Sequence, residues 1–209
     1  MPEAMLLVGQ CLASNESPYS RELLQKQLGS DLVDWIMVAA AANRHCLGPA
    51  LWSALDRKCL GQILPANARK YFGMLHALNV RRNLRIREQA REAALALNRR
   101  GLRPVLMKGA QFLFEEEHDP GARMMTDIDM LVAEDELPVA KSVLRSIGYR
   151  VLGQASDDTH AWTFYRPMSL VTIDLHRHVG PQRDLLPAGL AVERAIALPG
   201  VVPSLRGLS

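Results

Sequence analysis

Two aspartates separated by one residue are the first chemical signal in the sequence. Asp127 and Asp129 alternate with the apolar residues Ile128, Met130 and Val132. In a strand, residues i and i+2 point to the same face, so the two carboxylates project together and the apolar side chains fill the opposite face. Two carboxylates this close raise each other's proton affinity unless a cation lies between them, and oxygen ligands suit magnesium or manganese. The pair therefore predicts a divalent-metal site on a strand.

A lysine-glycine pair and a third aspartate extend this signal. Lys108 and Gly109 follow the apolar segment 104–107 and open a turn into a predicted helix. Asp174 lies between apolar neighbours in the alternating segment 170–179. A third carboxylate on a neighbouring strand is what a two-metal site needs. The alternatives are carboxylates that face solvent on an edge strand, a salt-bridged lysine and an ordinary turn glycine.

Strands and helices must position these residues in the second half of the chain. The predicted strands are 104–107, the segment that carries Asp127 and Asp129, 149–152, 160–165 and 170–179. The predicted helices are 110–118 and 133–147, and the predicted turns are 119–121 and 167–169. The acidic residues 134–136 suit the positive N-terminus of the second helix.

The first hundred residues have the periodicity of helices. Asp31 is the expected N-cap of a helix at 32–42. The segment 65–100 has no internal proline and predicts one long helix or two joined near Gly73. Five of its arginines lie close together, namely Arg81, Arg82, Arg85, Arg87 and Arg91. We interpret them as a solvated helix face, with a phosphate or RNA contact as the alternative.

Composition excludes several function classes. The chain has 209 residues, 48% apolar and 22% charged, which is ordinary for a soluble globular protein with a substantial core. A net charge of +3 does not indicate the strongly basic surface of a dedicated nucleic-acid-binding protein. The three cysteines, Cys11, Cys46 and Cys59, form no CxxC pair, which indicates free, buried thiols in a reducing compartment. With neither a signal-peptide pattern nor a run of about 18 apolar residues, we expect a cytoplasmic protein with no membrane partner.

Three motifs follow one another in the second half of the chain. They are Lys-Gly-Ala at 108–110, Arg-x-x-x-Asp-x-Asp-x-Leu-Val from Arg123, and Ile-Asp-Leu-His at 173–176. Their order and types resemble the DNA-polymerase-beta-like nucleotidyltransferase superfamily, and most of all its branch of uncharacterised bacterial nucleotidyltransferases. Toxin-type nucleotidyltransferases of abortive-infection systems share a similar arrangement. The specific resemblance covers residues 101 to about 179.

The resemblance implies a nucleotidyltransferase core with a mixed β-sheet flanked by helices, and with the helical first half it predicts an α+β fold. The implied division is a helical region at 1–100, the core at 101–182 and a C-terminal tail at 183–209. The implied activity moves a nucleoside monophosphate from a nucleoside triphosphate to a hydroxyl acceptor. It uses Mg²⁺ or Mn²⁺ in a two-metal in-line mechanism.

The resemblance also implies roles for individual residues. Asp127, Asp129 and Asp174 would be catalytic and bind the metal ions, and Asp174 would help to activate the acceptor hydroxyl. The implied nucleotide-binding residues are Lys108, Gly109, Ala110, Arg123 and His176. Backbone N–H groups at Gly109 and Ala110 would cradle the triphosphate, and Arg123 would add a bidentate contact. The alternative for His176 is an ordinary, partly buried histidine, which is the preferred reading of His178.

Two departures from the superfamily pattern widen the choice of function. Most members carry Gly-Ser where this chain has Lys108, Gly109 and Ala110, so no serine hydroxyl is available there. Relatives in the branch continue into a C-terminal helical region, which we expect this chain to lack because it ends at Ser209. A shortened, non-catalytic nucleotide- or partner-binding module is therefore one alternative. A DxD glycosyltransferase is the less favoured one, because it needs a larger α/β domain where residues 1–100 are helical. The acceptor, the preferred nucleotide and the oligomeric state are left open.

Overall fold

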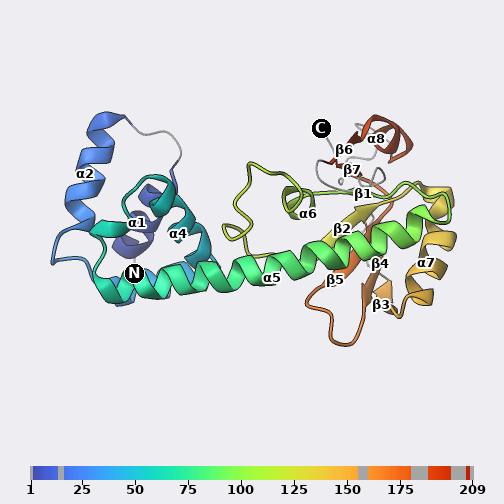
Figure 1. Cartoon of the computed structure of the whole chain (residues 1–209), viewed down its shortest axis with the longest axis horizontal. Coiled ribbons are helices and arrows are strands. Elements are labelled where there is room, and N and C mark those ends of the chain that lie inside the picture. The colour runs from blue at the N-terminus through green and yellow to red at the C-terminus, as the bar shows by residue number, and fades with distance from the viewer. Residues whose placement is uncertain (1, 14–16, 155–159, 180–187, 199–205, 208–209) are drawn as a thin grey trace. The chain divides into compact units, whose positions relative to one another are not determined.

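The computed structural model describes residues 2–13, 17–154, 160–179, 188–198 and 206–207. Its internal contacts divide the chain into two units (Figure 1). The helical unit comprises Met1–Arg81 and Asp119–Met124, and the sheet unit comprises Arg82–His118 and Met125–Ser209. The long helix α5 (Ala66–Asn98) contributes residues to both units. The division at residue 100 that the sequence suggests stays a prediction.

The helical unit confirms that the first part of the chain folds as helices. Its elements are α1 (Pro2–Leu12), α2 (Pro18–Leu28), α3 (Trp35–Arg44), α4 (Gly48–Arg57), the 3₁₀ turn η1 (Gly61–Ile63) and the first half of α5. These helices bury a common apolar core that includes Leu7, Val8, Val38, Leu51, Leu55 and Phe72. Burial of such side chains, rather than helix propensity, stabilises helices as short as these.

The N-cap prediction for the third helix is wrong by three residues. Asp34, not Asp31, precedes α3, and its Oδ1 accepts the N–H groups of Ile36 at 3.0 Å and Met37 at 3.1 Å. Asp34 has the extended backbone that an N-cap requires, whereas Asp31 lies in the preceding turn. Both residues are plausible caps by type, so only backbone conformation distinguishes them.

The segment Asp119–Met124 is tied to the first half of α5 within the helical unit. The Asp119 carboxylate accepts the Gly121 N–H at 2.8 Å and lies 2.8 Å from Nε2 of His76. Asn79 donates to the carbonyls of Gly121 and Arg123, each at 2.9 Å. Gly121 packs directly against the His76 ring, where a Cβ would have no room. The predicted turn at 119–121 is confirmed, and a larger residue at its glycine would displace the His76 ring.

Within the described residues, the sheet unit forms one mixed sheet of seven strands. The strands are β1 (Val105–Leu106), β2 (Asp127–Leu131), β3 (Arg150–Gln154), β4 (His160–Tyr165), β5 (Thr172–His176), β6 (Ile196–Ala197) and β7 (Arg206–Gly207). Their order is β3-β4-β5-β2-β1-β7-β6. The β2–β5 and β1–β7 pairs are parallel and the other pairs are antiparallel. The predicted α+β fold with a mixed sheet is confirmed.

One face of this sheet packs against helices. Ile128 and Met130 of β2 and Ile173 of β5 join a buried cluster with the second half of α5 and with α7 (Leu137–Ser146), which also lie beside the sheet in Figure 1. Alternation along the strands turns Asp127 and Asp129 to the opposite face. On that opposite face, α8 (Ala188–Arg194) covers residues of β1 and β2 near the far end of the strands.

The predicted helix at 110–118 is wrong in length. Helix α6 (Gly109–Phe112) has four residues and is followed by turns. The adjacent residues Leu113 and Phe114 are both buried, at 7% and 3% exposure, which draws the chain into the core. The Phe114 N–H then donates to Gln111 O at 2.9 Å, an i→i−3 bond of the turn that replaces the predicted continuation of the helix. The helix predicted at 133–147 is present as the 3₁₀ turn η2 (Glu134–Glu136) and α7.

No helix among the described residues combines the length and the apolar character needed to cross a membrane.

Candidate active site

The parallel register of β2 and β5 brings the three predicted carboxylates together. Asp129 lies opposite Asp174, and Asp127 lies opposite Thr172. Residues that are opposite on paired strands point to the same face, about 4.8 Å apart across the ladder. All three aspartates therefore share the sheet face that α5 and α7 leave uncovered.

Asp129 is the buried member of this group. Its residue exposure is 3%, and its Oδ1 lies 2.8 Å from Lys108 Nζ and 2.6 Å from His176 Nε2. Burial alone would raise the pKa of the Asp129 carboxyl, but the hydrogen bonds from His176 and Lys108 lower it below its ordinary value. Asp129 is therefore held as an ionised carboxylate.

Asp127 and Asp174 do not have hydrogen bonds comparable with those that Asp129 accepts from Lys108 and His176. Burial, and then the charges of Asp129 and Asp174, raise the pKa of Asp127 above its ordinary value. Asp174 is partly buried, and its Oδ1 is a buried oxygen that accepts no hydrogen bond from the described part of the chain. Uncompensated oxygens of this kind are costly, and a cation beside them would remove the cost.

The donor set fits a hard divalent cation. Carboxylate oxygens are the ligands that Mg²⁺ and Mn²⁺ prefer. Among the described residues, no ready-made cluster of three His, Cys, Asp or Glu side chains surrounds a metal position. Mg²⁺ is usually bound by one or two carboxylates together with substrate phosphates and water, so an enclosed protein cage is not required.

Lys108 reaches this face from a strained turn. It precedes α6 with a φ of 50°, in a region that non-glycine residues rarely adopt and that costs about 1–3 kcal/mol. Its side chain is 52% exposed, so its ammonium group binds Asp129 from the solvent side. Strain of this size persists where the surrounding structure enforces it, which is common at functional sites.

The other predicted nucleotide-binding residues are placed differently. Gly109 and Ala110 are buried, and the Ala110 N–H donates to Met107 O at 3.2 Å within the turn. Arg123 is exposed and belongs to the helical unit. His176 is 2% exposed and its ring is directed at Asp129. Of the predicted nucleotide contacts, the structure thus brings Lys108 and His176 to the carboxylates.

The contacts of Lys108 and His176 with Asp129 cannot be predicted from the strand pattern alone. The spacing of Asp174 and His176 by two residues places both on one strand face, which is the available signal. The register that sets His176 beside Asp129 depends on which strands pair, and this is a tertiary property. Sequence reasoning therefore names Lys108 and His176 without predicting their common partner.

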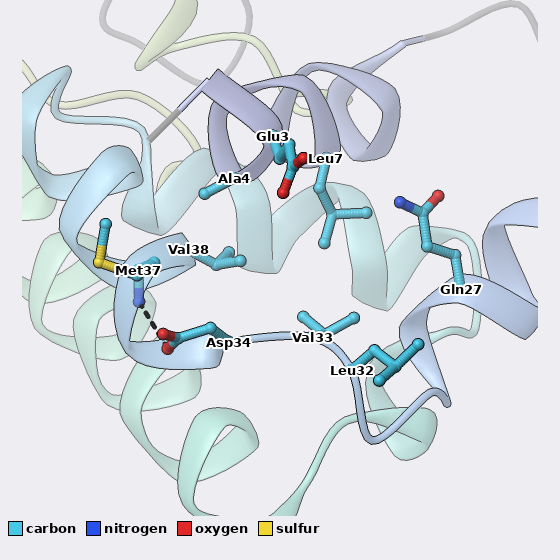
Figure 2. A pocket seen from close by; sticks show the side chains of 9 residues that line it. All are labelled: Glu3, Ala4, Leu7, Gln27, Leu32, Val33, Asp34, Met37 and Val38. Carbon is cyan, nitrogen blue, oxygen red and sulfur yellow. Dashed lines mark hydrogen bonds between the residues drawn. The ribbon is translucent and has the colours of Figure 1, made fainter.

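A pocket of about 310 Å³ lies in the helical unit (Figure 2). It is lined by Glu3, Ala4, Leu7, Gln27, Leu32, Val33, Asp34, Met37 and Val38. Two of these side chains are carboxylates and none is basic, so a triphosphate would meet repulsion and no cationic partner. The Asp34 carboxylate already caps α3 through Met37 N, as Figure 2 shows. The pocket is a poor nucleotide site although it has sufficient volume.

Comparison with known proteins agrees with the geometry of the sheet unit. No functionally curated protein matches this chain. The model of a protein family described as uncharacterised nucleotidyltransferase matches residues 31–200, a range that includes the three aspartates and the strands β1 to β6. The chain belongs to this family of uncharacterised nucleotidyltransferases.

Proposed function

We propose that the protein is a metal-dependent nucleotidyltransferase that moves a nucleoside monophosphate from a nucleoside triphosphate to a hydroxyl acceptor. The observation that carries the proposal is the register of β2 and β5, which sets Asp129 beside Asp174 and Asp127 on the same face. Membership of the nucleotidyltransferase family supports the general reaction.

Asp127, Asp129 and Asp174 would hold Mg²⁺ or Mn²⁺ together with the phosphates of the nucleotide. When bound, divalent metal supplies charge neutralisation at the attacking and leaving oxygens of an in-line displacement. The raised pKa of Asp127 and the unsatisfied Oδ1 of Asp174 support this assignment, since both point to missing positive charge.

The chain's own side chains would position the reactants. The Lys108 ammonium is half-exposed above Asp129, where it would contact the triphosphate as a compact charge. Asp174 would accept a hydrogen bond from the acceptor hydroxyl and so orient it for attack. Gly109, Ala110 and Arg123 are further candidates for the nucleotide, but Ala110 already uses its N–H within the turn. Most of the phosphate contact therefore falls to Lys108.

We propose a cytoplasmic location, because no disulfide joins the three cysteines. Cys11 is buried as predicted, whereas the prediction of buried thiols is wrong for Cys46 and Cys59, which are exposed. Exposed free thiols suit a reducing compartment.

One observation favours a second candidate, a module that binds a nucleotide or a partner without catalysis. Lys108 and His176 both contact Oδ1 of Asp129, so the protein's own side chains compensate the charge of this carboxylate. The same observation does not extend to Asp174, whose Oδ1 stays without a hydrogen bond from the described residues. We rank the module below the enzyme for this reason.

Label transfer distinguishes the two candidates. The protein is incubated with Mg²⁺ or Mn²⁺ and each α-labelled nucleoside triphosphate, and label is followed onto protein, RNA and a metabolite extract. We expect transfer by the wild type and its loss in Asp174→Asn. Asp135→Asn is the matched control, because Asp135 is an exposed aspartate of the same unit. Metal-dependent nucleotide binding with no transfer to any acceptor would favour the non-catalytic module.

A further inference from the structure

A buried histidine lies against the central aspartate of the candidate active site. His176 is 2% exposed, and its Nε2 lies 2.6 Å from Oδ1 of Asp129, which is itself 3% exposed. An ionised carboxylate only accepts hydrogen bonds, so the Nε2–H group of His176 is the donor. Hydrogen bonds to an ionised group are short and about twice as strong as neutral ones. This contact therefore holds the Asp129 carboxylate in one orientation.

The register of the two central strands produces this contact. His176 follows Asp174 by two residues on the same strand face and lies opposite Leu131. Asp129 is two residues before Leu131, so it is the diagonal neighbour of His176. Diagonal neighbours are about 7–8 Å apart, which is within the reach of an aromatic side chain. The ring thus reaches back to Asp129 across the face that also carries Asp174.

Among the described residues, the two side chains that contact the Asp129 carboxylate both reach the same oxygen. Lys108 Nζ lies 2.8 Å from Oδ1, the atom that His176 also contacts. The described residues place no hydrogen bond on Oδ2. A carboxylate held through one oxygen keeps the other in a fixed direction and available for a ligand. Metal-binding side chains are commonly oriented by such outer partners, whose removal costs about 10–100-fold in metal affinity or activity.

We propose that His176 is a positioning residue that fixes Asp129 and leaves its Oδ2 to the divalent cation. This inference rests on the proposed function, because it requires that the carboxylate face bind a cation. His176 acts through Asp129 and does not contact the nucleotide, since a ring that is 2% exposed offers almost no surface to a triphosphate. This role differs from the nucleotide contact expected from the sequence, and it assigns the phosphates to the more exposed Lys108.

Titration with Mn²⁺ alone separates positioning from nucleotide contact. Free Mn²⁺ is followed by its paramagnetic resonance signal in the wild type, His176→Phe and His176→Gln. Phenylalanine keeps a ring but has no donor, whereas the glutamine amide presents an N–H at a similar reach. His178→Phe is the matched control, because His178 is a partly buried histidine that follows the same strand. Denaturant unfolding of each variant monitors the fold.

We expect His176→Phe to weaken Mn²⁺ binding about 10–100-fold, with His176→Gln recovering much of the loss and His178→Phe binding as the wild type does. In label transfer, His176→Phe should lower kcat and leave KM for the triphosphate nearly unchanged. Unchanged Mn²⁺ affinity combined with a raised KM would instead identify a nucleotide contact and overturn the inference.

Two further outcomes keep the test decisive. If His176→Phe does not fold, His176→Asn replaces it, because the shorter asparagine amide does not reach Asp129. Equal Mn²⁺ affinity of the His176→Asn and His176→Gln variants would then overturn the inference. If the wild type binds no Mn²⁺ with or without a triphosphate, the proposed function fails and the inference fails with it. A wild type that binds Mn²⁺ beside a His176→Phe variant that binds equally well removes only the positioning role.

Discussion

Both units of the chain carry partly buried or pocket-lining carboxylates, but the carboxylates differ in whether hydrogen bonds compensate their charge. In the helical unit, Asp34 lies at a well-formed pocket and is satisfied by two backbone N–H groups at the start of α3. In the sheet unit, Asp174 keeps a buried oxygen without a hydrogen bond from the described residues, and Asp127 has a raised pKa. The helical unit is therefore distinguished by the volume of its pocket, and the sheet unit by carboxylates whose charge is not compensated.

This difference shows which property to follow when function is read from structure. An N-cap carboxylate stabilises its helix by about 1 kcal/mol and needs no further partner. Like carboxylates placed side by side destabilise one another, so a fold retains them at a cost unless a ligand compensates. Perturbed ionisable groups are enriched at active sites, and here they favour the sheet face over the pocket as the candidate site.

The largest expected effect comes from removing a carboxylate of the sheet unit. Asp127→Asn should lower nucleotidyl transfer by more than about 100-fold, since loss of even an outer partner of a metal ligand costs about 10–100-fold. Its stability at neutral pH should not fall, because the raised pKa of Asp127 means that its charge opposes folding. Steady-state transfer rates and denaturant unfolding measure the two quantities.

Asp34→Ala is the counterpart of that variant in the helical unit. It should cost about 0.5–2 kcal/mol of stability through loss of the N-cap and leave transfer unchanged. A fall in transfer comparable with that of Asp127→Asn would show that the pocket takes part in the reaction.

Core substitutions give the next largest effect. Leu55 of the helical unit and Ile128 of β2 are both 0% exposed, so Leu55→Ala and Ile128→Ala should each cost about 2–5 kcal/mol of stability. Only Ile128→Ala should also weaken Mn²⁺ binding under conditions where both variants remain folded, because Ile128 supports the strand between the two aspartates. Thermal unfolding and Mn²⁺ titration measure this pair, and equal loss of Mn²⁺ affinity would contradict the distinction.

Loss of one ammonium group should have a smaller effect. Lys108→Met should raise KM for the triphosphate about tenfold, because a hydrogen bond to a charged group is worth about 1.5–3 kcal/mol. Lys70→Met is the control, since Lys70 is an exposed lysine of the helical unit. Initial rates over a range of triphosphate concentrations determine both values. A KM unaffected by Lys108→Met would remove this residue from the phosphate contact.

The smallest expected effect is a pH dependence of stability at an ion pair of the sheet unit. Two hydrogen bonds from Arg166 to Glu92, at 2.9 and 2.6 Å, lower the pKa of Glu92 below its ordinary value of 4.5, although burial opposes the shift. A depressed pKa gives stability that is present above the unfolded value and is lost as pH falls through the folded value.

Glu92→Gln should therefore cost less than about 1 kcal/mol at neutral pH, because the Glu92 side chain is 48% exposed. The difference between wild type and variant should shrink as the pH falls below 4.5. Denaturant unfolding at a series of pH values measures it, and a difference that grows in acid would have the wrong sign.

Local sequence patterns predicted the elements with strong periodicity. The alternation around Asp127 and in the segment 170–179 predicted the strands observed as β2 and β5, although β5 is shorter than predicted (Thr172–His176). The lack of internal proline in 65–100 predicted the helix observed as α5. These elements are fixed by side-chain period and backbone breakers, which act over a few residues. The α+β fold class followed from them together with the family resemblance.

Features that depend on distant parts of the chain could not be predicted in this way. The two-residue strands β6 and β7 have no local period, and they join the sheet through pairing with β1 and with each other. The parallel pairing of β2 with β5 sets Asp129 beside Asp174, but register across strands is not encoded by either strand alone. The bonds from Lys108 and His176 to Asp129 depend on that register.

Anomalous diffraction from a crystal that contains Mn²⁺ and a non-hydrolysable nucleoside triphosphate would locate the metal and the nucleotide directly. We expect Mn²⁺ peaks beside Asp127, Asp129 and Asp174, with the phosphates of the nucleotide next to the metal and Lys108 turned toward them. Peaks confined to the carboxylates of the helical-unit pocket, or a nucleotide bound away from the sheet face, would contradict it.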